Sequence, residues 1–185
     1  MDNLYQPPAA DLSLPAALSD EPPFFISAPH KVVALFLLTF GFYSVYWFYR
    51  HWRAQEQETP EIWPAMRSVF NLFFTHALFR RIADKHAAAG LGRWDYSGMA
   101  WFYVAMCVFS NVVDRIFSDN SFASLASIFI VMSAVIPLQA AQAYANRASG
   151  DPEGQSNSGF TLANWLWATL GIVLWIFVLI GALMG

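Results

Sequence analysis

The sequence feature that most constrains the fold is an uncharged run of eighteen residues, Val32 to Tyr49, which begins apolar and ends crowded with aromatics. A helix rises about 1.5 Å per residue, so roughly twenty such residues cross the ~30 Å hydrocarbon core of a bilayer. The aromatic end leads into Arg50 and Arg53. Aromatic rings favour the headgroup layer, and arginines favour its cytoplasmic side. The run therefore predicts a transmembrane helix near 31–53 that ends in the cytoplasm.

Three further uncharged windows are long enough to cross a membrane. With their polar ends trimmed, they predict transmembrane helices near 97–117, 122–147 and 161–183. Charged residues make up only 12% of the chain, against about a quarter in an ordinary soluble domain. Water does not tolerate that composition unless long apolar faces are hidden. The sequence therefore predicts an all-α membrane protein with four transmembrane helices.

The segment 63–82 is apolar but too often interrupted by cations to cross. Arg67, Arg80 and Arg81 leave only twelve uncharged residues in a row. Polar residues recur at every fourth position on one side and apolar residues occupy the other, which is typical of a helix lying in the membrane interface. We predict such an amphipathic helix near 63–89 on the cytoplasmic side. A fifth span at 63–82 stays open as the alternative.

The distribution of cations predicts the orientation of the chain. Seven of the ten lysines and arginines lie between the first two predicted spans, namely Arg50, Arg53, Arg67, Arg80, Arg81, Lys85 and Arg93. The positive-inside rule places that segment in the cytoplasm. Alternation then puts residues 1–30 and the C-terminus outside and the loop 147–159 inside. Residues 1–30 hold six of the ten prolines and only acidic charges, which predicts a mostly disordered tail without a cleavable signal peptide.

The first predicted span also carries a recognisable sequence signature. Lys31 is followed by Thr39-x-Gly41-x-Tyr43-x-x-Tyr46-Trp47-x-Tyr49-Arg50-x-Trp52. This pattern resembles the signature of a family of small bacterial multi-pass membrane proteins of unknown function. The resemblance covers about residues 24–53. It implies a protein of the bacterial inner membrane, and it offers no activity, ligand or cofactor to transfer.

Two predicted helices carry polar side chains along one face. These residues are Thr39, Tyr43, Tyr46, Tyr103, Asn111 and Asp114. Helical spacing brings the first three together on the helix near 31–53 and the last three together on the helix near 97–117. They form a candidate polar seam that lines a ligand or proton path. The competing interpretation, which we favour, has the tyrosines hydrogen-bonding within the bundle and Asp114 anchored at a helix end that water reaches.

Small and conformationally restricted residues in the third predicted span indicate where helices meet. Proline lacks the N–H that would bond to the carbonyl four residues earlier, so Pro137 predicts a kink near Ser133 and Ala134. Pro137, Ala141 and Ala145 form a narrow ridge. Such a ridge suits close contact with another helix, either within the chain or in a second copy.

Patterns that would indicate catalysis or a metal site are missing from the sequence. The four histidines lack an i, i+4 partner, and the single cysteine, Cys107, cannot form a disulfide or a cysteine-based metal site within one chain. We therefore predict no catalytic residue, no cofactor and no metal. A net charge of −3 without a basic face argues against nucleic acid as a partner. The predicted contacts to lipid headgroups are Arg50, Arg53, Arg67, Arg80, Arg81 and Lys85.

The predicted function is that of an integral inner-membrane protein without enzymatic activity. It would serve as a subunit, scaffold or regulator that packs its helices against membrane lipids and against a second copy or another membrane protein. A small oligomeric channel or transporter is the alternative, motivated by the polar seam. A membrane-embedded enzyme is the third hypothesis.

Overall fold

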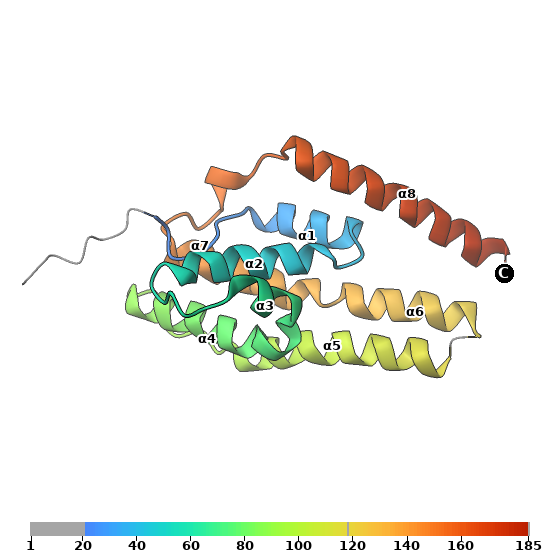
Figure 1. Ribbon diagram of the computed structural model, residues 1–185, viewed down its shortest axis with the longest axis horizontal. Coiled ribbons are helices and arrows are strands. Elements are labelled where there is room, and N and C mark those ends of the chain that lie inside the picture. Colours follow the sequence, from blue (N-terminus) through green and yellow to red (C-terminus); the bar gives the residue numbers. More distant parts are fainter. Residues whose placement is uncertain (1–20, 118, 185) are drawn as a thin grey trace, which may run out of the picture.

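The computed structural model describes residues 21–117 and 119–184, and that part of the chain contains helices but no strand. Three helical stretches are long and apolar enough to cross a membrane. The first is α5 (Ser97–Ile116), the second consists of α6 (Ser121–Met132) and α7 (Val135–Ala148), and the third is α8 (Leu162–Met184). Figure 1 shows α5 running antiparallel to α6 and α7 along the long axis of the molecule. These helices indicate a multi-pass membrane protein.

The prediction of a continuous span near 31–53 is wrong. The segment forms two helices, α1 (Pro29–Leu38) and α2 (Tyr43–Glu56), and the chain reverses between them to give a helical hairpin. Phe40 and Gly41 at the reversal have left-handed φ angles of 54° and 82°, and the Gly41 N–H donates to the Phe36 carbonyl at 2.9 Å. Glycine adopts this conformation without a steric cost and commonly closes a helix in this way. The uncharged run is therefore folded in half.

A threonine side chain stabilises the reversal. The Thr39 hydroxyl donates to the Leu35 carbonyl at 2.7 Å and accepts from the Tyr43 N–H at 3.0 Å. One side chain thus adds a second hydrogen bond to the Leu35 carbonyl, which also accepts from the Thr39 N–H, and gives a partner to an N–H at the start of α2. Because a hairpin of this length cannot reach across the bilayer and back, the structure contains three candidate spans rather than four.

The predicted surface helix is present but broken in two. It forms α3 (Pro64–Val69) and α4 (Asn71–Ala88), with the break at Phe70, and it is not among the candidate spans. Its polar residues Asn71 and Thr75 are buried, whereas Phe73 on the other side is 80% exposed. In this first part of α4 the large apolar side chains face outward and the small polar ones face the protein, whereas Leu78, Phe79 and Ile82 further along are buried. This arrangement suits a helix whose outer face meets lipid.

The segment from Glu21 to Ala28 differs from the tail predicted for residues 1–30. It is irregular chain whose first two residues are exposed and whose later part enters the core, where Phe24 and Ala28 are fully buried. It lies against the end of α7 and the loop 147–159, whereas the prediction put the two on opposite sides of the membrane. Residues 1–20 of the predicted tail lie outside the described residues.

The predicted kink at Ser133 and Ala134 is confirmed, because α6 ends at Met132 and α7 begins at Val135. The small-residue ridge beyond it faces inward. Ala141 and Ala145 are fully buried, where α7 packs against α1, α4 and α5. The ridge thus serves contacts within the chain.

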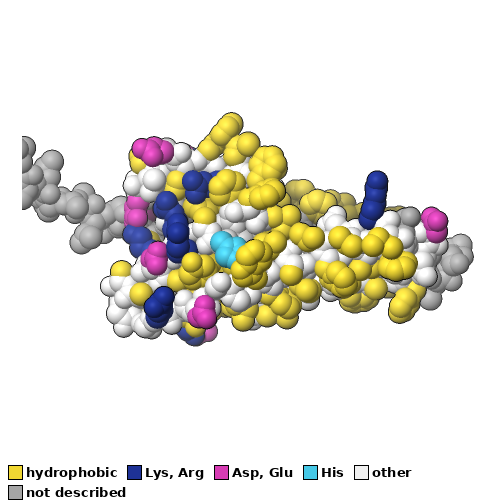
Figure 2. Space-filling model, turned by 90° about the horizontal axis from the view of Figure 1, so that it is seen from below, with side chains coloured by type: hydrophobic (Ala, Val, Ile, Leu, Met, Phe, Trp, Pro, Cys, Tyr) yellow, Lys and Arg dark blue, Asp and Glu magenta, His cyan; other side chains and the backbone are white. Residues whose placement is uncertain are grey.

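The two ends of the molecule differ in surface chemistry. Lysines, arginines and acidic residues crowd one end, where α2, α4 and the loop after α7 meet, and a broad hydrophobic surface extends from there (Figure 2). In the three candidate spans only 17%, 28% and 11% of the residues are buried within the protein. Apolar surface on that scale requires lipid or other helices as its surroundings.

Candidate functional site

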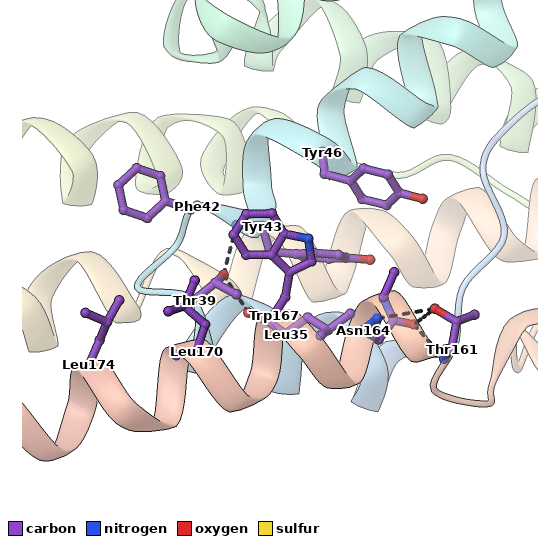
Figure 3. Close-up of a pocket in the computed structure, with 12 residues that line it drawn as sticks. Leu35, Thr39, Phe42, Tyr43, Tyr46, Thr161, Asn164, Trp167, Leu170 and Leu174 are labelled. Atoms are coloured by element: carbon purple, nitrogen blue, oxygen red, sulfur yellow. Dashed lines mark hydrogen bonds between the residues drawn. The ribbon is translucent and has the colours of Figure 1, made fainter.

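A groove lies between the helical hairpin and α8. It encloses about 340 Å³ and is drawn in Figure 3. The hairpin and α8 both contribute to its walls, which are made by Leu35, Thr39, Phe42, Tyr43, Tyr46, Thr161, Ala163, Asn164, Trp167, Leu170, Gly171 and Leu174. A volume of this size falls within the range of small-molecule binding sites.

One end of the groove is closed by tight contact between α8 and the hairpin tip. A Cβ atom added at Gly171 would lie 1.9 Å from the Leu38 carbonyl oxygen, so only glycine permits this approach. Beyond it, the Trp175 indole N–H donates to the Leu37 carbonyl at 3.0 Å. The Trp175 ring stacks on Phe40 at a centroid distance of 4.4 Å. These contacts fasten α8 to the end of α1.

The other end of the groove is polar and is set by the start of α8. The N–H and the hydroxyl of Thr161 both donate to Asn164 Oδ1, and the Asn164 N–H donates to the Thr161 hydroxyl oxygen at 3.3 Å. This reciprocal arrangement is a capping box with asparagine in the third helical position. It fixes the start of α8 and holds both side chains at the mouth of the groove (Figure 3).

Tyr46 connects the groove to a cation. Its hydroxyl accepts from an Arg50 guanidinium N–H at 2.8 Å, and the same guanidinium lies over the Phe25 ring at 4.4 Å from the centroid. Arg50 is exposed. Stacking and the hydrogen bond hold the Arg50 guanidinium in one place. A ligand that binds it therefore loses less side-chain entropy than a ligand that must order a free arginine.

The predicted polar seam is split by the fold. Thr39, Tyr43 and Tyr46 line the groove. Tyr103 is buried elsewhere, where its hydroxyl donates to Asn71 Oδ1 at 3.2 Å. The remaining two predicted residues are exposed, namely Asn111 and Asp114. Asn111 lies in a separate, shallow depression beside α4 and donates to the Cys107 carbonyl of its own helix. The structure therefore keeps the two halves of the seam apart.

The α8 side of the groove was missing from the site prediction. Thr161, Asn164 and Trp167 lie one turn apart along α8 and complete the wall opposite the tyrosines. The Thr161–Asn164 spacing is a capping signal in the sequence, and Gly171 is a small residue suited to close helix contact. Neither signal says which helix packs against α8, because that partner lies more than a hundred residues earlier in the chain.

Most of the predicted headgroup cations have protein partners. Arg67 lies over the Trp52 ring at 4.5 Å, and Arg81 donates to Gln55 and Thr59. Surface ion pairs hold two others, namely Arg53 with Glu56 and Lys85 with Glu58. Arg80 is exposed. Their contact with lipid headgroups stays a prediction.

A buried polar network holds the segment 21–28 in place. Gln142 accepts from the Trp47 indole N–H at 2.6 Å and donates to the Phe25 carbonyl and to Asn146 Oδ1. Asn146 in turn exchanges two hydrogen bonds with the Ser27 backbone. Buried amides that are satisfied in this way specify one packing of the chain. We interpret the network as structural.

His51 lies fully buried beside this network. It packs against Trp47 and the rings of Phe24 and Phe25, with its Nε2 3.4 Å from Gln142 Oε1. Burial lowers the pKa of His51 to about 3, because the surrounding aromatic residues cannot solvate a charged imidazole. His51 is therefore neutral at physiological pH. No acid or nucleophile is placed near it within the hydrogen-bonded groups described above.

Among the described residues, no three His, Cys, Asp or Glu side chains converge on a point where a metal ion could bind. Comparisons of the chain with family models, with curated proteins and with solved structures find no match. The resemblance of residues 24–53 to a family of bacterial membrane proteins therefore stays a prediction.

Proposed function

We propose that this chain is an integral protein of the bacterial inner membrane that acts without catalysis, as a subunit or regulator. Its working contact is the outward face of α8, which packs against a helix of a second copy or of another membrane protein. The three candidate spans support the membrane placement. The surface helices α3 and α4 lie at the cytoplasmic end, and the hairpin α1–α2 extends from that end along α8 to Trp175.

The single observation that carries the proposal is the exposure of α8. Within this chain α8 packs mainly against α1, with a smaller contact to α6. Its outward residues are large and apolar, and Trp165, Leu166 and Phe177 are 59%, 64% and 66% exposed. Helices in lipid associate through close packing and interhelical hydrogen bonds. Because its own chain covers α8 on one side only, most of the surface of α8 is available for packing against another helix.

The cations support the orientation. The seven arginines and lysines between α1 and α5 lie at the end where Lys31 donates to Asn157 and Gly159 and where α7 ends with Arg147. Arg115 lies at the other end of α5. With three spans, this arrangement puts Glu21 in the cytoplasm and the end of α8 outside. The earlier prediction of an external N-terminus is replaced accordingly.

Cysteine labelling in cells tests the orientation. In a Cys107→Ser background, single cysteines at Gln155 and at Asp119 should react from opposite sides with a membrane-impermeant maleimide. Only Asp119→Cys should label in intact spheroplasts, and Gln155→Cys should label after lysis. Labelling of Gln155→Cys in intact spheroplasts would refute the orientation.

Crosslinking tests the contact of α8. A photo-crosslinking amino acid at Val173, which is 42% exposed, should trap a dimer or a discrete heteromeric product in cells. The same amino acid at Ala168, which is 2% exposed on the same helix, should give less of that product. If the protein purified as a monomer in lipid nanodiscs and Val173 trapped no protein in cells, the proposed function would be wrong.

A small oligomeric channel or transporter is the second candidate function. The observation that favours it is the groove, in which hydroxyl and amide groups from Thr39, Thr161 and Asn164 line an opening beside a candidate span. Flux of small solutes through reconstituted liposomes, abolished by Leu170→Trp in the groove wall, is the expected result. Liposomes that hold a pH and ion gradient unchanged would remove this candidate.

A further inference from the structure

The groove between the hairpin and α8 is an unfilled space between two helices that touch at only one end. The helices touch at Gly171 and Trp175, then diverge toward the start of α8 and leave about 340 Å³ open. Protein interiors are close-packed, and large unfilled apolar volumes are rare. In a bilayer, acyl chains lie next to this opening. The groove is therefore shaped to admit one of them.

The groove has a polar end and an apolar end. In Figure 3 the polar groups of Thr161, Asn164 and Tyr46 lie toward one end, and Phe42 and Leu174 lie toward the other. The polar end is the cytoplasmic end under the proposed orientation, because Thr161 follows the loop that holds Lys31. A ligand that fits this gradient is an amphiphile with its headgroup in the cytoplasmic leaflet.

The length of the groove matches one leaflet. Thr161, the residue before α8, and Leu174 are thirteen residues apart, which corresponds to roughly 20 Å along the helix axis. Half of the hydrocarbon core is about 15 Å thick. An acyl chain that starts beside the headgroup layer at Asn164 therefore reaches Leu174 near the bilayer centre, where the hairpin tip ends the groove.

The polar end of the groove carries uncompensated positive charge. Arg50 bonds to the Tyr46 hydroxyl and lies over Phe25, and no ion pair involves it within residues 21–117 and 119–184. Lys31, one turn before Leu35 of the groove wall, donates only to neutral oxygens, those of Asn157 and Gly159. Within the described residues neither cation has a carboxylate partner; Lys31 is buried and adds to the positive potential, and the exposed Arg50 favours an anionic headgroup.

We propose that this groove binds one acyl chain of an anionic phospholipid of the cytoplasmic leaflet, with the lipid phosphate against Arg50 and the Tyr46 hydroxyl. The acyl chain lies between the hairpin and α8, along Leu170 and Leu174, and ends at Phe42. The inference rests on the membrane placement of the proposed function and is independent of which protein contacts the outward face of α8.

Native mass spectrometry of the detergent-purified chain tests the site. The protein is titrated with phosphatidylglycerol or with phosphatidylcholine of the same acyl chains, and singly lipid-bound protein is measured. Phosphatidylglycerol should saturate one site and outcompete phosphatidylcholine. Arg50→Gln should weaken phosphatidylglycerol binding about fivefold, the equivalent of the ~1 kcal/mol that one cation contributes at an anionic surface. Arg53→Gln is the matched control and should leave binding unchanged, because Arg53 already pairs with Glu56.

A second pair of variants tests the acyl chain. Leu170→Trp fills the groove and should abolish the single bound lipid, whereas Leu166→Trp on the outward face of α8 should retain it. Equal loss in the two tryptophan variants, or equal binding in the Arg50 and Arg53 variants, would overturn the proposal. Equal affinity for phosphatidylcholine would also overturn it. Monomer–dimer state is measured in the same spectra, so failure of the lipid site is distinguishable from failure of the α8 contact.

Discussion

Gly171→Ala should detach α8 from the hairpin. The added Cβ would lie 1.9 Å from the Leu38 carbonyl oxygen and 2.7 Å from its carbonyl carbon. Both atoms belong to the backbone at the end of α1, so neither can move aside as a flexible side chain would. The two helices must separate, and the stack of Trp175 on Phe40 and the hydrogen bond to Leu37 are lost with the movement.

The expected cost follows from these contacts. Overpacking of a close contact typically costs about 1–3 kcal/mol, and the aromatic pair and the hydrogen bond add about 0.5–1.5 kcal/mol each. Because helix separation relieves part of the clash, we expect a net loss of about 2–3 kcal/mol. For a chain of this size, that loss lowers the midpoint of thermal unfolding by about 4–12 °C.

Gly181→Ala is the matched control, because nothing lies within 4 Å of a Cβ added at Gly181 on the same helix. Alanine favours helix over glycine by about 1 kcal/mol, so this variant should melt at or slightly above the wild-type temperature. Both variants are measured in one detergent at one scan rate. A spin-label distance between Phe42→Cys and Leu174→Cys should lengthen in Gly171→Ala only. Equal melting and equal distances in both variants would refute the close approach of α8 to Leu38.

Three further outcomes are expected. His51 has a pKa of about 3 when folded, against 6.5 in the unfolded chain, so the unfolded state binds an extra proton below pH 6.5. The stability that His51 contributes is therefore present above pH 6.5 and falls by about 1.4 kcal/mol per pH unit below it. In urea titrations at pH 7 and 5.5, the free energy of unfolding should change less with pH in His51→Gln than in the wild type. An equal change in both proteins would contradict the burial of His51. Asn146→Ala removes both hydrogen bonds to Ser27 and should expose the segment 21–28 to proteolysis. Gln139→Ala, at an exposed position of the same helix, should not. Equal digestion of the two variants would show that the segment is held by other contacts. Tyr103→Phe leaves Asn71 without its Tyr103 partner and should lower the free energy of unfolding by about 1–2 kcal/mol in the same titrations; an unchanged free energy would show that this bond contributes nothing.

Three of the four apolar windows correspond to the candidate spans, because length and composition alone decide them. The helices α5, α6–α7 and α8 begin and end within a few residues of the predicted bounds, and proline chemistry located the break before Val135. These features depend on local sequence. Hydrophobic windows and a missing N–H donor are visible without knowledge of tertiary contacts.

The hairpin was not predicted because the residues that stabilise it lie far apart in the sequence. An uncharged run of eighteen residues satisfies every criterion for a span, and a single glycine inside it is tolerated in membrane helices. The reversal depends on Phe40 in a left-handed conformation, which costs about 1–2 kcal/mol. The contact that offsets this cost is the stack on Trp175, 135 residues later in the chain. No pattern within residues 31–53 can indicate a contact with the Trp175 ring.

The sequence predicted the hairpin side of the groove but not the α8 side. Thr39, Tyr43 and Tyr46 share a surface although the helix is interrupted between them, because α2 begins immediately after the reversal and Thr39 caps it. The predicted partnership with Asn111 and Asp114 depended on one continuous helix facing another. The folded hairpin turns its tyrosines toward α8 instead.

The packing of residues 23–28 determines when this segment can fold during synthesis of the chain. The Pro23 carbonyl accepts from nearby Gln55, but the carbonyls of Phe25, Ile26 and Ser27 accept from Gln142, Asn157 and Asn146, which are translated more than a hundred residues later. The Ser27 N–H and the carbonyls of Phe25 and Ile26 therefore lack these partners until the ribosome has passed Asn157. A chain released before that position would lack the hydrogen bonds that Asn157 makes to Ile26 and Ala28.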